Sequence, residues 1–173
     1  MKFSKIVPDN MKDLVYPEQL TLWSMRFWSD GFRQNYSAYE TLREAYFRAK
    51  CPGGLLSLDN FFSLVIAGHS RPVDVRCPCC AGVSNDEWRI LQALALAQAG
   101  EGIQIRQLIS HFLEPATVRI AEPIILQWAQ QLKDSGLILP LRSSIHQVIQ
   151  KNYATKNGVA LKVYTNPQKT TLH

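Results

Sequence analysis

Apolar side chains recur three to four residues apart in three segments of the first half of the chain, which is the spacing of an amphipathic helix. The first segment starts near Pro17, a residue that suits the first helical position. The second opens on the capping pattern Ser37-Ala-Tyr-Glu40, and Cys51-Pro-Gly-Gly54 is expected to end it. The third covers residues 57–68 and is apolar on most sides, so we expect it to be buried. The apolar stripes of the first two segments are Leu20, Trp23, Phe27 and Phe32, and Tyr39, Leu42, Tyr46 and Ala49.

Three further helices are predicted in the second half of the chain. The capping box Ser84-Asn-Asp-Glu87 opens the first of them, which stops at Gly100. The second helix is broken by Glu114-Pro115. The third begins with Pro123 as its first residue and ends at Gly136, where a left-handed residue is needed after the helix. Six apolar residues of the last two helices are expected to share one core: Leu108, Ile109, Phe112, Ile125, Trp128 and Leu132.

The end of the chain predicts a small amount of β-structure. The run Leu137–Leu141 is typical of a short edge strand, because Pro140 cannot donate a hydrogen bond to a sheet. Asn157-Gly158 separates two strand-like segments and is a strong hairpin signal. The expected fold class is therefore mainly α, with an N-terminal helical bundle over residues 1–76 and a C-terminal half over residues 77–173 that carries the β-hairpin.

Three helices, a strand and a hairpin in this order resemble a winged helix-turn-helix domain over residues 84–165, and the phrase Leu132-Lys-Asp-Ser-Gly-Leu-Ile138 is the most specific match. By this resemblance, residues 123–135 would be the recognition helix and Asn157-Gly158 the wing tip. The implied function is that of a DNA-binding regulatory or accessory protein acting on double-stranded DNA. Its candidate contacts are amides that read base edges and amines that bind phosphates: Gln127, Gln130, Gln131, Lys133, Lys156 and Lys162.

Two alternatives to DNA binding stay open. The connection over residues 114–122 is longer than the tight turn usual in the winged-helix superfamily, and the same kind of module also serves in dimerisation and assembly. The second hypothesis is thus a protein-interaction module, with a protein partner or a second copy of the chain. An apolar patch over the third helix of the C-terminal half would favour it, whereas a positive stripe would favour DNA. The third hypothesis is a thiol- or metal-dependent enzyme, although the sequence has no phosphate loop, dinucleotide fingerprint or nucleophile elbow.

Composition and charge narrow the class of protein. Of the 173 residues, 46% are hydrophobic and 19% are charged, which is a globular balance rather than a disordered one. The net charge of +5 and the pI of about 9.1 are compatible with nucleic acid or with an acidic partner. No secretory signal is apparent, and the most apolar run, residues 61–68, is too short to cross a bilayer. A cytoplasmic protein that does not contact membranes is therefore expected.

The cluster Cys77-Pro78-Cys79-Cys80 is the strongest chemical signal in the chain. It resembles one zinc knuckle of the Cys-Pro-x-Cys type, and a structural zinc ion needs four ligands. The residues that complete a candidate zinc site with Cys77 and Cys80 are Cys51 and His69, and Cys79 is able to replace either cysteine of the pair. Two other interpretations remain beside the metal site: buried thiols that pack as small hydrophobic side chains, and thiol redox chemistry.

Overall fold

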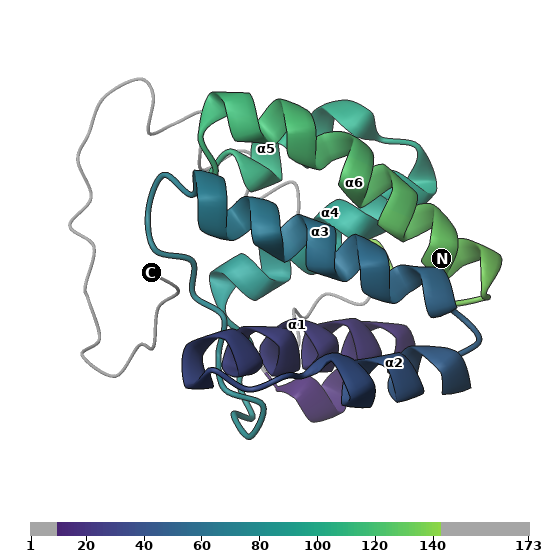
Figure 1. The fold of residues 1–173 in the computed structure, drawn as a ribbon. Helices are drawn as coiled ribbons and strands as arrows, with labels where there is room; N and C mark the ends of the chain where they lie inside the picture. The colour runs from purple at the N-terminus through teal and green to yellow at the C-terminus, as the bar shows by residue number, and fades with distance from the viewer. Residues whose placement is uncertain (1–9, 143–173) are drawn as a thin grey trace.

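The computed structural model describes residues 10–142, and these residues are mainly helical, as the sequence predicts. Six α-helices follow a short 3-10 turn in the described range (Figure 1). Their bounds are η1 Met11–Asp13, α1 Tyr16–Gln34, α2 Tyr39–Arg48, α3 Pro52–Gly68, α4 Asn85–Ala99, α5 Gly102–Ile109 and α6 Pro115–Asp134. None of these helices combines the length and the apolar character that crossing a membrane requires.

One hydrophobic core joins all six helices. In Figure 1, α1 and α2 lie together below α3 and α6, which run side by side, and α4 lies behind them. Helix α3 buries one face in this core, with Leu58, Phe61 and Phe62 at 0% exposure, whereas Leu56, Asp59 and Asn60 are exposed, so the expectation of a buried helix holds for one face only. The six residues expected to share a core all belong to it, including Trp128, which is 0% exposed. Val73 and Val75, in the link between the two predicted halves, are buried in the same core. The described parts of the two halves therefore fold around shared apolar side chains.

Two helix ends in the second half, the start of α4 at Ser84 and the end of α6 at Gly136, match the sequence prediction. The hydroxyl of Ser84 accepts from the backbone N–H of Glu87 at 3.1 Å, and the Glu87 carboxylate accepts from the backbone N–H of Ser84 at 2.8 Å. Gly136 has a φ of +75°, and the N–H of Leu137 donates to the carbonyl of Leu132 at 2.8 Å. This is the Schellman arrangement, in which a left-handed glycine allows the last carbonyls of a helix to be satisfied. The capping box and the stop at Gly136 are confirmed.

Two boundary predictions in the first half are wrong. The third helix, expected to begin at residue 57, begins at Pro52: the run Cys51-Pro-Gly-Gly54 follows the end of α2 as predicted but also starts α3, with Pro52 at the first helical position. Gly54 is needed there for space, since a Cβ on it would lie 2.5 Å from a ring carbon of Tyr46. The expected capping box at Ser37 does not form either, because α2 begins at Tyr39 and has no side-chain cap.

The two prolines of α6 were assigned the wrong roles. Pro115 is the first residue of α6 rather than a break, and Pro123 lies inside the helix. An interior proline has no N–H, so the carbonyl four residues earlier, here that of Arg119, loses its hydrogen-bond donor. Because Pro123 is exposed, this carbonyl can bond to water instead. The predicted recognition helix, residues 123–135, is therefore the second part of a longer helix. The link between α5 and α6 shrinks to residues 110–114.

The predicted edge strand after α6 does not form. Residues 137–142 form no strand, and β-structure elsewhere in residues 10–142 is limited to isolated bridges, such as Asn10–Gly82 and His69–Leu113. The segment 137–142 instead bonds to glutamine side chains of α4. The Gln98 amide donates to the carbonyl of Leu137 at 2.9 Å and accepts from the N–H of Leu139 at 2.8 Å, and Gln92 accepts from the N–H of Arg142 at 3.1 Å. The predicted hairpin at Asn157-Gly158 lies outside the described residues.

Candidate functional site

Three cysteines meet in the loop of residues 76–82, which we call the cysteine turn. Cys77 and Cys80 are joined in a disulfide, and the N–H of Cys80 donates to the carbonyl of Cys77 at 3.1 Å. The free sulfur of Cys79 lies 2.9 Å from that of Cys77, and all three sulfurs lie within 4.8 Å of one another. Cys79 is exposed, and Cys77 and Cys80 are half-buried. The three side chains are close enough to hold one metal ion in their reduced form.

A buried ion pair holds both ends of the cysteine turn. Arg26 of α1 and Glu87 of α4 are both 0% exposed, and their side chains form two hydrogen bonds at 2.8 and 2.9 Å. Arg26 also donates to the backbone carbonyls of Cys80 and Gly82, at 2.5 and 2.6 Å. Glu87 accepts from the N–H of Arg76 at 3.0 Å. The backbone on either side of the cysteines is therefore fixed by charge-assisted hydrogen bonds.

Cys51 and His69 are not part of the group of ligand atoms formed by the three sulfurs of the cysteine turn. They flank α3, whose 17 residues at about 1.5 Å per residue place its two ends roughly 25 Å apart. The sulfur of Cys51 is buried against the backbone carbonyl of Gln131 at 3.4 Å, and Nδ1 of His69 lies 3.1 Å from the carbonyl of Val65. The structure thus brings Cys77 and Cys80 together with Cys79, and not with the other two proposed ligands.

A second charged cluster lies next to the cysteine turn. Asp86 accepts two hydrogen bonds from Arg71, at 2.7 and 2.8 Å, and one from Arg89 at 2.8 Å. Burial raises the pKa of Asp86, but these bonds, the N–H of Asp74 and the two positive charges outweigh it and leave the pKa below its usual range. Burial and the same two arginines lower the pKa of His111. The cluster has the character of a structural ion-pair network.

Most of the predicted DNA-reading side chains on α6 are occupied within the protein. Gln131 accepts from the hydroxyl of Ser57 at 2.7 Å, Gln130 donates to Asp134 at 2.6 Å, and Lys133 donates to the carbonyl of Gln98 at 3.0 Å. Gln127 is exposed on the outer face of the helix. Lys156 and Lys162 lie outside the described residues.

The outer face of α5 and α6 is more apolar than a DNA-reading surface requires. Ile103 of α5 is 78% exposed, and Ile120 and Leu126 of α6 are 56% and 41% exposed. The positive charge of Arg106 is paired with Glu122 at 2.5 Å, which leaves Arg119 as the cation on this stretch of α6.

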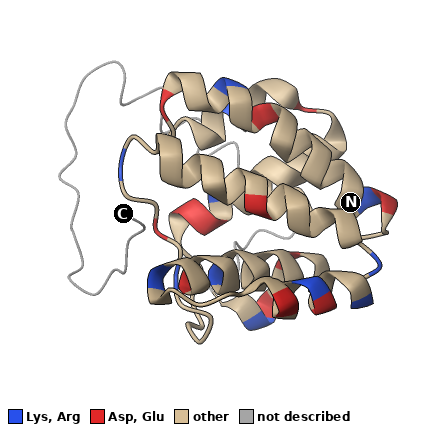
Figure 2. Cartoon of the chain, in the orientation of Figure 1, with Lys and Arg blue, Asp and Glu red and all other residues tan. Residues whose placement is uncertain are grey.

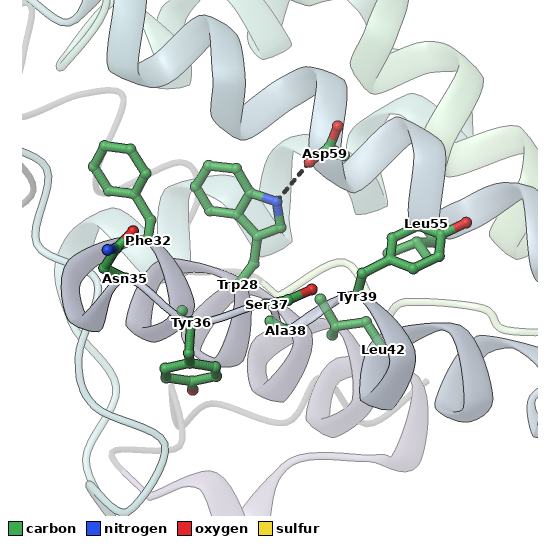
Figure 3. Close-up of a pocket in the computed structure, with 11 residues that line it drawn as sticks. Trp28, Phe32, Asn35, Tyr36, Ser37, Ala38, Tyr39, Leu42, Leu55 and Asp59 are labelled. Carbon is green, nitrogen blue, oxygen red and sulfur yellow. Dashed lines mark hydrogen bonds between the residues drawn. The ribbon is translucent and has the colours of Figure 1, made fainter.

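An aromatic groove, which the sequence analysis did not identify, lies between α1, α2 and α3 (Figure 3). Two adjoining hollows of about 360 and 380 Å³ share Tyr39, Leu55 and Asp59 in their lining. Phe32 and Tyr39 flank Trp28 in the view of Figure 3, and the indole N–H of Trp28 donates to Asp59 at 2.8 Å. We define the aromatic groove by its main lining side chains: Trp28, Phe32, Tyr36, Tyr39, Arg43, Phe47, Leu55, Leu56 and Asp59. The charge of Arg43 is paired with Glu40 at 2.6 Å.

The groove was missed because its aromatic residues fit helical stripes that the sequence analysis assigned to the core. Phe32 and Tyr39 stand at the ends of such stripes, yet they are 49% and 57% exposed. The available signal was the concentration of aromatic residues over positions 27–47. Aromatic side chains left exposed in a group mark binding surfaces more often than chance exposure does.

Net charge is unevenly distributed along the chain. Residues 10–142 contain 13 Lys or Arg and 13 Asp or Glu, so the helical body is formally neutral. Figure 2 shows positive and negative segments interspersed over its helices. Residues 143–173 add four lysines and no acidic residue beyond this body.

No protein-family model, curated protein or solved structure matches the chain. The function is therefore inferred from the sites alone.

Proposed function

We propose that this chain is a protein-interaction module that binds a partner segment in the aromatic groove. The observation that carries the proposal is the exposed aromatic and aliphatic surface of α2 and α3. Phe47 is 71% exposed and Leu56 is 61% exposed, and both line one of the two hollows. Burying such side chains against a partner gives a favourable free energy in proportion to the apolar area removed from water. Aromatic residues are also enriched at the centres of protein interfaces.

The charge of Asp59 indicates the chemistry of the partner. Asp59 lines both hollows and accepts from Trp28, but none of the ion pairs formed within residues 10–142 includes it. The nearest acidic residues of α2 differ in this respect, since Glu40 and Glu44 each pair with an arginine. A carboxylate amid aromatic rings favours a cation on an apolar stem. The partner is therefore an apolar segment that carries a Lys or Arg.

The test uses two synthetic amphipathic peptides that are identical except for one Lys in the first and Glu in the second. Binding is followed by NMR through the indole N–H of Trp28. The Lys peptide is expected to move this signal and to bind about tenfold more tightly, which corresponds to about 1.4 kcal/mol. Asp59→Asn should remove the preference, and Tyr39→Ser should weaken both peptides. Leu126→Ser, on the outer face of α6, is the matched control and should change neither affinity. Equal affinities for the two peptides, or shifts confined to other regions, would refute the proposal.

DNA binding by the winged-helix-like half is the second candidate, because two observations favour it. The α5–α6 connection covers five residues, 110–114, which is close to the turn of three to four residues in a helix-turn-helix motif and supports the resemblance. The lysines of residues 143–173 concentrate positive charge after α6.

Duplex affinity across a salt series tests this second candidate separately. Replacing Lys156 or Lys162 by Ala should lower the salt slope by about one unit each, because each lost phosphate contact releases one fewer counterion. Gln127→Ala should alter sequence preference, since amides read base edges. Lys12→Ala, at the opposite end of the described range, serves as the control. Absence of salt-dependent binding at about 50 mM salt would exclude DNA, since non-specific attachment is strong there.

A further inference from the structure

The cysteine turn differs from a cluster of packed thiols. Buried cysteines that act as small hydrophobic side chains avoid solvent, and Cys51 is such a residue, with 2% of its surface exposed. Cys79, in contrast, is exposed, and Cys77 and Cys80 are half-buried. Three sulfurs within 4.8 Å at the protein surface are accessible to reductants and to metal ions.

The backbone of the cysteine turn is already ordered for a ligand. The Arg26–Glu87 pair fixes the carbonyls of Cys80 and Gly82 and the N–H of Arg76, so three sulfurs are presented from a loop that needs no further folding.

We propose that the cysteine turn is a redox-gated site for one soft monovalent metal ion, Cu(I), bound by the thiolates of Cys77, Cys79 and Cys80. Reduction opens the site: an external dithiol supplies two electrons and two protons, the Cys77–Cys80 bond breaks to give two thiols, and the dithiol becomes a disulfide. Binding of Cu(I) then forms three Cu–S bonds and releases one proton for each thiol that ionises. The disulfide closes the site, because it leaves a single thiol at Cys79.

The number of ligands selects the ion. Thiolates favour soft metals such as Cu(I) and zinc. A structural zinc ion takes four protein ligands. Among residues 10–142, no fourth histidine, cysteine or carboxylate lies within the 4.8 Å range of the three sulfurs. Cu(I) is satisfied by three thiolates, so the turn matches it without a ligand from elsewhere.

The experiment titrates the full-length reduced chain with Cu(I) under anaerobic conditions, in competition with a chromogenic Cu(I) chelator. One ion per chain is expected, and X-ray absorption should show three sulfur neighbours. Cys79→Ser should weaken binding at least about tenfold, since even outer-shell changes at metal sites cost 10- to 100-fold. Cys51→Ser, which removes a buried thiol remote from the turn, is the matched control and should bind as the unmodified chain does. The oxidised chain should bind no Cu(I) at the same chelator concentration.

Three results would overturn the proposal. The first is equal Cu(I) affinity of the Cys79→Ser variant and the unmodified chain, which would remove Cys79 from the site. The second is equal binding by the oxidised and reduced chains, which would remove the redox gate. The third is a parallel titration with zinc in which zinc displaces Cu(I), since a fourth ligand would then be present. Far-ultraviolet circular dichroism of each variant confirms that a lost affinity does not come from lost helices.

Discussion

Replacing Arg26 by Met is expected to be among the most destabilising single changes in the protein. Arg26 and Glu87 are fully buried, and the substitution keeps most of the apolar stem but removes the charge. Glu87 then retains the N–H groups of Arg76 and Ser84 as partners, at 3.0 and 2.8 Å, with no cation beside it. Removing one member of a buried pair costs about 3–5 kcal/mol, because a charge is left without compensation in the interior. The total free energy of unfolding of a native protein is roughly 5–15 kcal/mol.

Urea unfolding, followed by circular dichroism, measures this loss. Arg48→Met is the matched control, since Arg48 pairs with Glu44 at 2.7 Å on the surface. Breaking that exposed pair should cost no more than about 0.5 kcal/mol. The double variant Arg26→Met/Glu87→Leu should lose less unfolding free energy than the two single variants lose in sum, because it leaves no unpaired buried charge. A loss below about 1 kcal/mol for Arg26→Met, or additive losses, would refute the role assigned to the pair.

Three further predictions test the core and the charged cluster. Trp128→Ala should cost about 3–5 kcal/mol in urea unfolding, because the side chain is fully buried and leaves a cavity. Gly54→Ala should lower the free energy of unfolding by about 1–3 kcal/mol, since the added Cβ meets the ring of Tyr46. Gly102→Ala, at the open start of α5, is the control and should be neutral or stabilising when both variants are compared by thermal unfolding. The pKa of His111 is held below its unfolded value of 6.5, so the folded state binds its proton less well and stability falls as pH drops below about 6.5. His111→Gln should reduce this loss between pH 7 and pH 5, and an unchanged pH profile would contradict the assignment.

Features that a few neighbouring residues decide could be predicted from the sequence. The capping box at Ser84 and the left-handed stop at Gly136 follow from bonds within one turn of helix, and both are present. The assignment of Pro123 failed because proline is compatible with a first position and also with an exposed interior position. Only the course of the rest of the chain decides between the two. The predicted strand failed for a related reason: the partners of residues 137–142 are the side chains of Gln92 and Gln98, and side-chain partners of this kind leave no periodic pattern.

The candidate sites were predictable only in part. Three cysteines within four positions guarantee that their sulfurs are near one another, so the cysteine turn was visible in the sequence. Its anchoring by Arg26 was not visible, because 61 positions separate Arg26 from Glu87. Arg26 lies on the buried side of α1, where a hydrophobic pattern predicts no charge. Cys51 and His69 were predicted as metal ligands from their residue type. Their positions at opposite ends of α3 do not follow from the sequence pattern.

The bond between Arg142 and Glu18 has a consequence for the order in which the protein is made. Glu18 is fully buried in the first turn of α1, and the guanidinium that neutralises it, at 2.5 and 2.9 Å, comes from 124 positions later in the chain. A ribosome adding roughly 5–20 residues per second needs about 6–25 s to synthesise that interval. During this time the carboxylate has the backbone N–H of Val15 as a partner, at 3.1 Å, but no cation, and it favours solvent. We therefore expect the N-terminal end of α1 to reach its final packing only after residue 142 has left the ribosome, so that the last described segment completes the packing of the first helix.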